Sequence, residues 1–196
     1  MEDVRICYIG DTILNGIGDS TLLGWAGRLS RISQNSKHYI THYNLGVVGD
    51  TSSDIVDRWE IEVNRRLSNS SINCIVFSFG LSDSIIENKR VKVSLIDSMK
   101  NARAIIGRAK VKYNVAMIGP TAVIDEIHNA RIKSYDEAYS TVCGMLGINY
   151  LSIFKILIND IDWIEDIKKN DNIHPTEKGH EIIANHIYNW KGWWFI

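Results

Sequence analysis

The residues best suited to proton-transfer chemistry lie near the C-terminus. Asp171 stands three positions before His174, and Pro175 follows the histidine directly. In a tight loop this spacing brings a carboxylate against ring nitrogen Nδ1, which fixes the tautomer and leaves Nε2 as a base. Pro175 favours an extended backbone at His174, because the residue before a proline avoids the helical region. The pattern therefore predicts an oriented general base. The other histidines lack such neighbours, and we interpret them as structural or solvated: His38, His42, His128, His180 and His186.

A second candidate group lies near the N-terminus, where the run GDTILNG occupies positions 10–16 after an apolar stretch. A short hydroxyl residue at a strand end can sit on a sharp turn, with the following backbone N–H groups facing the same space. Thr12 would then offer a hydroxyl beside donors for an anion or a developing oxyanion. Two other interpretations stay open. One is a plain strand-to-helix turn. The other is a phosphate-binding loop, although the spacing matches neither GxGxxG nor GxxxxGK[ST].

Two more glycine-containing segments follow apolar runs. NLGVVGDT occupies positions 44–51, and GLSDS occupies positions 80–84. Gly49 would let the backbone approach a ligand closely. The hydroxyl of Ser82 would face the same crevice, whereas Asp83 fits equally well as a cap of the next segment. Each segment taken alone is only a turn signal.

The elements that must position these groups alternate along the chain. Nearly continuous apolar runs at 4–9, 72–79 and 114–118, with weaker ones at 39–43 and 148–151, are typical of strands covered on both faces. Apolar residues at helical spacing predict helices over 55–67, 95–106, 135–146 and 182–190. This alternation predicts βαβ units in a single domain over 1–196: a three-layer α/β/α sandwich with a parallel, flavodoxin-like sheet of about five strands. Ligands bind beyond the carboxyl ends of such strands.

Taken in order, the four segments resemble the sequence blocks of SGNH (GDSL-type) hydrolases. Ile9 to Thr12 is similar to the first block, Gly-Asp-Ser, and Gly49 stands at the glycine of the second block. Positions 80–83 resemble the third block, Gly-x-Asn-Asp, and positions 171–175 match the last block, Asp-x-x-His. The resemblance runs from about Ile6 to Ile187, which is nearly the whole chain.

This resemblance implies an ester hydrolase or acyltransferase that acts on a small acyl ester of a lipid, an aryl alcohol or an acetylated sugar. It implies Thr12 as nucleophile, His174 as base and Asp171 as the group that orients the base. The implied oxyanion hole consists of three donors: Thr12 N–H, Gly49 N–H and the Ser82 hydroxyl. Three further residues are expected to contact the substrate: Asp11, Asp83 and Trp25.

The sequence departs from the family pattern at two positions. Thr12 replaces the serine nucleophile, and its extra methyl restricts χ1 and crowds the line of attack. Ser82 replaces the asparagine donor and reaches less far; loss of such a donor costs on the order of 10²–10³ in rate. We therefore expect a weak or specialised hydrolase. Two alternatives stay open: a catalytically silent relative that binds an acyl or sugar ligand in the same cleft, and a flavodoxin-like phosphate or nucleotide binder.

Composition restricts the choice of partners. The net charge is −1 with 23% charged residues interspersed along the chain, so nucleic acid is not an expected partner. The three cysteines, interpreted as core residues, form no metal-ligand spacing, and neither a metal nor another cofactor is expected. No signal peptide is recognised, and no apolar stretch approaches the ~20 residues of a membrane span. The chain is therefore predicted to be cytoplasmic.

Aromatic residues crowd the end of the chain: Trp190, Trp193, Trp194 and Phe195. We predict that this tail folds back on the last helix and covers core surface. A dimer contact, which would make the protein a homo-oligomer, and an apolar patch near the substrate entrance are the alternatives.

Overall fold

The chain folds around one parallel sheet. The structure is a computed structural model that describes residues 1–67 and 70–195. The strand order is β2-β1-β3-β6-β7, and every neighbouring pair is parallel. The strands are β1 (Glu2–Gly10), β2 (His38–Gly46), β3 (Ile72–Ser78), β6 (Asn114–Ile118) and β7 (Asn149–Leu151). The predicted five-stranded sheet with flavodoxin-like order is confirmed.

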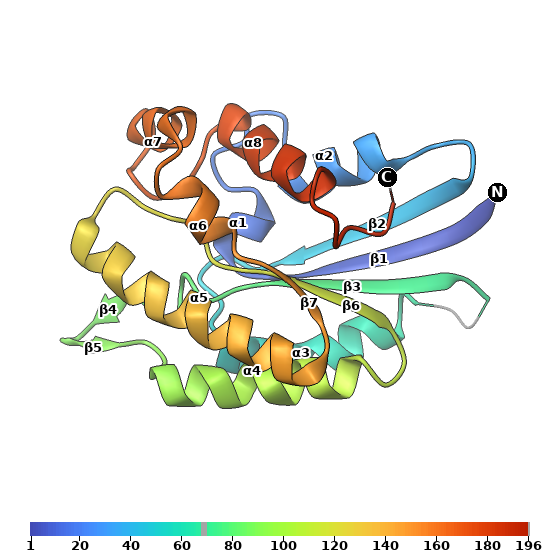
Figure 1. Cartoon of the computed structure of the whole chain (residues 1–196), viewed down its shortest axis with the longest axis horizontal. Helices are drawn as coiled ribbons and strands as arrows, with labels where there is room; N and C mark the ends of the chain where they lie inside the picture. The colour runs from blue at the N-terminus through green and yellow to red at the C-terminus, as the bar shows by residue number, and fades with distance from the viewer. Residues whose placement is uncertain (68–69, 196) are drawn as a thin grey trace.

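Helices cover both faces of the sheet (Figure 1). One layer holds α1 (Thr12–Asn15), α2 (Gly24–Ser33), α6 (Ile153–Leu157), α7 (Ile161–Lys168) and α8 (Glu177–Tyr188). The other layer holds α3 (Ser52–Asn64), α4 (Leu95–Ala109) and α5 (Glu126–Leu146). A small antiparallel hairpin, β4 (Ile86–Glu87) and β5 (Arg90–Val91), projects between β3 and α4. The arrangement is the predicted α/β/α sandwich.

Strand β1 lies inside the sheet, between β2 and β3, and both of its faces pack into the core. Ile6 and Tyr8 pack into the core on the α2–α8 side, whereas Cys7 and Ile9 pack into the core on the α3–α5 side. The strand ends at Gly10, where a Cβ atom would lie 1.7 Å from the carbonyl oxygen of Ser78. The backbones at the carboxyl ends of β1 and β3 therefore lie so close together that only glycine, which has no side chain, fits at this position.

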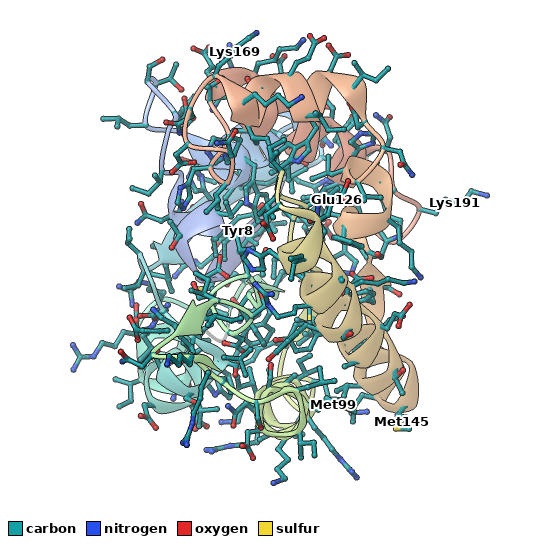
Figure 2. All side chains as sticks on the ribbon, turned by 90° about the vertical axis from the view of Figure 1, so that its left-hand side faces the viewer. Tyr8, Met99, Glu126, Met145, Lys169 and Lys191 are labelled. Carbon is teal, nitrogen blue, oxygen red and sulfur yellow. The ribbon has the colours of Figure 1, made fainter. Side chains whose placement is uncertain are left out.

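Four segments meet at this carboxyl edge of the sheet. We call them the threonine loop (residues 10–23), the glycine loop (47–51), the serine loop (79–85) and the histidine loop (169–176). Figure 2 views the molecule from this edge, with Lys169 in the upper layer and Met99 of α4 in the lower layer. The sheet thus gathers residues that are more than 150 positions apart in sequence, as between Thr12 and His174.

The aromatic tail covers the core, as predicted. Trp193 and Phe195 are buried in the cluster on the α2–α8 side. The indole N–H of Trp193 donates to Ser33 Oγ at 2.8 Å, and the ring of Phe195 lies against that of His38. The tail therefore packs on α2 and the start of β2, beyond the last helix (Figure 1).

The three cysteines lie in the protein interior. Cys7, Cys74 and Cys143 are buried free thiols, and burial raises the pKa of each to about 12. They act as small core residues, as interpreted from the sequence. Among the described residues no helix has the length and apolar character needed to cross a bilayer.

Candidate active site

The threonine loop presents Thr12 as the first residue of a four-residue helix. Asp11 caps this helix by accepting a hydrogen bond from Ile13 N at 3.2 Å. As the first helical residue, Thr12 has an N–H with no partner inside the helix. Its hydroxyl oxygen accepts a hydrogen bond from Gly49 N at 2.8 Å, and the residue is 8% exposed. A hydroxyl and two backbone N–H groups therefore meet at the tip of β1.

The glycine loop is fastened to the threonine loop through Arg58 of α3. This guanidinium donates from Nε to Asp50 Oδ2 at 2.7 Å and from a terminal nitrogen to the carbonyl oxygen of Gly10 at 3.1 Å. Gly49 has a φ of +82°, a region that side-chain-bearing residues rarely adopt. Backbone conformation and the arginine clamp together direct Gly49 N–H at the hydroxyl of Thr12.

Asp83 anchors the serine loop to the helices that pack against it. The Asp83 carboxylate is fully buried and accepts hydrogen bonds from Ser52 N at 2.7 Å and from Ser98 Oγ at 2.5 Å. Ser82, directly before it, forms no side-chain hydrogen bond within the described part of the chain, and its oxygen is not among the fully enclosed, unpaired polar atoms. The serine loop is thus anchored at Asp83 and leaves the Ser82 hydroxyl unengaged.

The histidine loop contains the predicted carboxylate–imidazole pair. His174 Nδ1–H donates to Asp171 Oδ2 at 2.6 Å, while Asp171 Oδ1 accepts from the backbone amides of Ile173 at 3.0 Å and His174 at 2.8 Å. Partial burial raises the pKa of Asp171, but these hydrogen bonds outweigh it and hold the pKa below its usual range. With Nδ1 protonated and bonded, Nε2 carries a free lone pair.

Asp166 of α7 holds the histidine loop in place. This buried carboxylate accepts hydrogen bonds from Thr176 N at 2.8 Å, Thr176 Oγ1 at 2.5 Å and Gly179 N at 3.1 Å. Asp166 was not predicted from the sequence, although a signal exists. Trp163, Asp166 and Ile167 share one face of α7 at positions i, i+3 and i+4, so an aspartate stands on the buried side of that helix.

The first and last loops of the site touch each other. Gly18 lies so close to the Pro175 carbonyl oxygen that a Cβ atom would be 2.2 Å away. Arg28 forms a salt bridge with buried Asp19 and lies 3.6 Å from Glu177 Oε1 at the start of α8. The sequence contains no local sign of these contacts, which bring the two ends of the chain to one site.

The hydroxyl and the imidazole are not hydrogen-bonded to each other. Among the described residues no hydrogen bond joins Thr12 Oγ1 to His174; the hydroxyl oxygen accepts from Gly49 N–H, and its own hydrogen has no partner there. His174 Nε2 likewise has no partner there. Catalytic hydrogen bonds are often loose without substrate. Proton transfer between the two residues requires the Thr12 hydroxyl to turn or a water molecule to bridge them.

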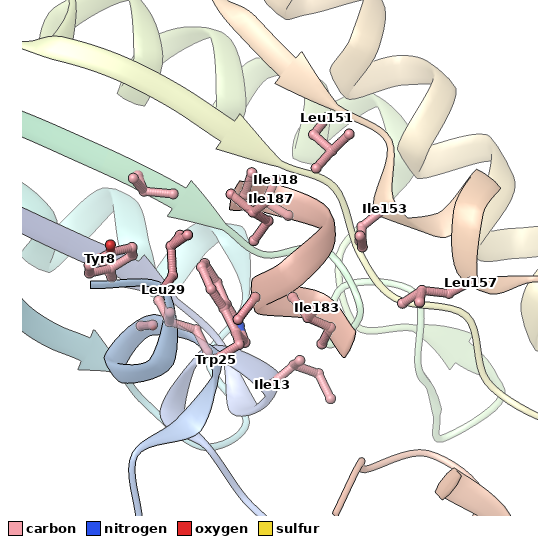
Figure 3. Packing of buried hydrophobic residues seen from close by; sticks show 14 of the residues in the cluster. Tyr8, Ile13, Trp25, Leu29, Ile118, Leu151, Ile153, Leu157, Ile183 and Ile187 are labelled. Carbon is pink, nitrogen blue, oxygen red and sulfur yellow. The ribbon is translucent and has the colours of Figure 1, made fainter. Parts of the chain in front are cut away.

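The residues expected to contact substrate lie inside the protein. Asp11 is 3% exposed, Asp83 is fully buried and Trp25 is 1% exposed. Trp25 packs among core residues that include Ile13, Leu29 and Tyr8, as Figure 3 shows. Such burial leaves little surface for a substrate, as it does for Ser82, which is 2% exposed, and contact of these three side chains with a substrate stays a prediction. Asp11 and Asp83 also shape the loops that carry Thr12 and Ser82.

Comparison with known proteins identifies the family of the chain. The model of the GDSL-like lipase/acylhydrolase family matches residues 8–182. The chain therefore belongs to the GDSL-like lipase/acylhydrolase family, whose members are ester hydrolases. No curated protein matches the sequence.

Solved structures of ester hydrolases share the fold. A lipase/acylhydrolase from Enterococcus faecalis is 19% identical with a TM-score of 0.75, over 96% of this chain and 94% of the other. An acetylxylan esterase from Geobacillus stearothermophilus is 15% identical with a TM-score of 0.77, over 98% and 95% of the two chains. The esterase EstA from Pseudoalteromonas sp. is 16% identical with a TM-score of 0.74, over 94% of each chain. At these identities the likeness concerns the fold.

Proposed function

We propose that this protein hydrolyses or transfers a small acyl ester through a threonine–histidine–aspartate triad. The observation that carries the proposal is the bond of 2.6 Å between His174 Nδ1 and Asp171 Oδ2, which leaves Nε2 as a base. Gly49 N–H supports it, because it lies 2.8 Å from the hydroxyl oxygen of Thr12. A hydrogen-bond donor thus stands beside the expected nucleophile, where an oxyanion would form.

In the first half of the reaction Thr12 Oγ1 attacks the carbonyl carbon of the ester, and His174 Nε2 accepts the hydroxyl proton. The carbonyl oxygen becomes an oxyanion that accepts hydrogen bonds from Thr12 N–H, Gly49 N–H and the Ser82 hydroxyl. When the carbon–oxygen bond to the leaving group breaks, the imidazolium returns its proton to the departing alcohol. The acyl group remains on Thr12.

In the second half an acceptor hydroxyl attacks the acyl-threonine, and His174 again accepts its proton. Water as acceptor releases a carboxylic acid, whereas an alcohol or sugar gives acyl transfer. His174 then protonates Thr12 Oγ1, which restores the free enzyme. Asp171 stabilises the imidazolium in both halves through its bond to Nδ1.

The surface beside the nucleophile favours an apolar acyl group. Val47 and Val48 directly precede Gly49, and both are exposed. Because Gly49 N contacts the hydroxyl of Thr12, these two valines border the expected reaction centre. An acyl chain that covers them leaves water, which is favourable for apolar surface.

The second candidate function is ligand binding without catalysis. It is favoured by one observation: within the described chain no hydrogen bond joins the Thr12 hydroxyl to His174. The threonine methyl restricts χ1, so the hydroxyl turns toward the imidazole less freely than a serine hydroxyl would. A silent relative would bind acyl or sugar esters and release them unchanged.

Kinetics with matched variants separate the two functions. We would assay wild type, Thr12→Ala, Thr12→Ser and His174→Ala on short-chain p-nitrophenyl esters and on acetylated sugars. Thr141→Ala and His186→Ala are controls, since both residues lie on helices and form no part of the triad. A catalyst loses activity with Thr12→Ala and His174→Ala and keeps it in both controls. Hydrolysis that survives both triad changes rules out the mechanism, and activity confined to Thr12→Ser identifies a silent relative.

A further inference from the structure

Asp11 differs from every other fully or nearly buried aspartate in the described chain. Asp19, Asp83, Asp136 and Asp166 each have both carboxylate oxygens hydrogen-bonded. In Asp11 only Oδ1 has a partner, the amide of Ile13, whereas Oδ2 is fully enclosed without one. A buried polar atom without a hydrogen bond carries a desolvation cost that proteins rarely leave uncompensated. Such a group therefore calls for a functional explanation.

The surroundings of Asp11 connect two loops of the active site. Burial raises the pKa of Asp11 to about 7, and the neighbouring carboxylate of Asp83 raises it too, while the backbone amides of Ile13, Ser82 and Gly80 oppose the shift. Of these three amides only that of Ile13 forms a hydrogen bond to the carboxylate in this structure. The amides of Ser82 and Gly80 belong to the serine loop, and Asp11 belongs to the threonine loop. The carboxylate thus stands between the expected nucleophile and one of its expected oxyanion donors.

The other ionisable groups around Asp11 are few. Tyr139 of α5 lies within its electrostatic influence, because Asp11 contributes to the raised pKa of this phenol. Arg58 of α3 donates to the carbonyl oxygen of Gly10, the residue directly before Asp11. Tyr139 stays neutral under ordinary conditions and the arginine stays charged. Asp11 itself is therefore the group here that changes charge near neutral pH.

We propose that Asp11 is a positioning residue whose carboxylate, when ionised, draws the amides of Gly80 and Ser82 toward it and so fixes the Ser82 hydroxyl at the oxyanion site. Protonation removes the negative charge that attracts these amides and loosens the serine loop. The inference rests on the proposed function, because it assigns a task to Asp11 within that reaction. Activity would then depend on the ionisation of Asp11 in addition to the deprotonation that any imidazole base requires.

Two deprotonations should then control activity in acid. The imidazole of His174 must be neutral to act as a base, and Asp11 must be ionised to hold the serine loop. We expect log kcat/KM to rise with pH more steeply than slope 1, toward about 2, over roughly one to two pH units where Asp11 also titrates, and with a slope of about 1 throughout in Asp11→Asn. At pH 8 the variant should lose kcat by about 10- to 100-fold, less than a fully removed oxyanion donor costs. KM should stay within about twofold, because the lost interaction belongs to the transition state.

An NMR titration tests the same inference without an assay. We would follow the side-chain carboxyl carbon of Asp11 together with the backbone amides of Gly80 and Ser82 in wild type, Asp11→Asn and Asp125→Asn. Asp125 is the matched control, because it caps α5 as Asp11 caps α1. The expected result is one common midpoint near pH 7 for the carbon and both amides in wild type and in the control. In Asp11→Asn the titration of the two amides should disappear.

Any one of three results would overturn the inference. The first is titration of the Asp11 carboxyl carbon near pH 4, and the second is a pair of amides that do not titrate with it. The third is an unchanged slope of kcat/KM against pH in acid when Asp11 is replaced by Asn. If wild type hydrolyses no ester, the proposed function fails separately, and the titration still decides whether Asp11 controls the serine loop. If Asp11→Asn does not fold, the wild-type titration decides alone. A shared midpoint of the Asp11 carbon and the two amides supports the inference, and separate midpoints overturn it.

Discussion

The two halves of the candidate site are built in opposite ways. The base lies near the surface: the side chains of His174 and Asp171 are 21% and 47% exposed, and the hydrogen bonds that orient the pair come from within the histidine loop. The nucleophile lies inside: Thr12 is nearly buried, and its hydroxyl accepts a hydrogen bond from Gly49 of a separate loop. Residues close together in sequence therefore orient the base, whereas contacts between distant segments position the nucleophile. Changes to the two halves should have different consequences.

Removing the base should have the largest effect on activity. A positioned general base contributes between about 10² and 10⁴ in rate, so His174→Ala should lower kcat/KM by that factor. The fold should tolerate the change, because the side chain bonds only to Asp171 within the described chain. We would measure kcat/KM on p-nitrophenyl acetate together with the melting temperature. Unchanged activity would mean that His174 is not the base.

Restoring the residues typical of the family at the nucleophile and at the oxyanion donor should raise the catalytic rate. Thr12→Ser removes a methyl group that restricts χ1, and freer rotation of the hydroxyl toward the imidazole should raise kcat by roughly 3- to 10-fold. Adding Ser82→Asn supplies a longer donor, for which a gain on the order of 10²-fold is expected. The double variant should be the most active form of the protein. A double variant slower than wild type would indicate that this cleft is adapted to its own residues.

Loosening the histidine loop should affect both stability and activity. Asp166→Ala leaves the buried amides of Thr176 and Gly179 without their acceptor, which should cost about 2–4 kcal/mol of unfolding free energy. Because this loop carries His174, kcat should fall more than KM rises. Asp162→Ala, an exposed position on the same helix, is the control. Equal loss of stability in the two variants would show that Asp166 does not anchor the loop.

The last expected effect concerns the pH dependence of stability at Asp11, not catalysis. Its pKa is about 7 in the fold against an ordinary value of 3.8, so between these values the folded chain binds a proton that the unfolded chain has lost. The contribution of Asp11 to stability therefore falls as pH rises from about 4 to 7, by at most about 4 kcal/mol. The melting temperature of Asp11→Asn relative to wild type should rise over this range. A constant difference would contradict the raised pKa.

Much of the fold could be predicted because its signals are local. Continuous apolar runs indicated the central strands, and the spacing of Asp171, His174 and Pro175 indicated the oriented base. The short helices α1, α6 and α7 were not predicted, because helices of this length depend on packing rather than on their own sequence. Helix α5 begins at Glu126, earlier than the apolar spacing indicated, because its first turns are polar and capped by Asp125.

The contacts that complete the site could not be read from sequence. The bond from Gly49 to Thr12 joins residues 37 positions apart, and the anchoring of Thr176 by Asp166 depends on how α7 packs. The sequence also suggested Asp11, Asp83 and Trp25 as substrate contacts, since Asp11 and Asp83 belong to the blocks and Trp25 follows the first one closely. Burial depends on the whole fold, and it places these three side chains in the protein interior.

Covalent trapping tests the central claim most directly. We would incubate the protein with a p-nitrophenyl alkylphosphonate, which transfers its phosphonyl group to an activated hydroxyl, and locate the adduct by peptide mass spectrometry. The proposed triad predicts one adduct per chain on Thr12, formed more slowly in His174→Ala and absent in Thr12→Ala. An adduct on another residue such as Ser82 or Ser84, or labelling of Thr12 at the same rate without His174, would contradict it.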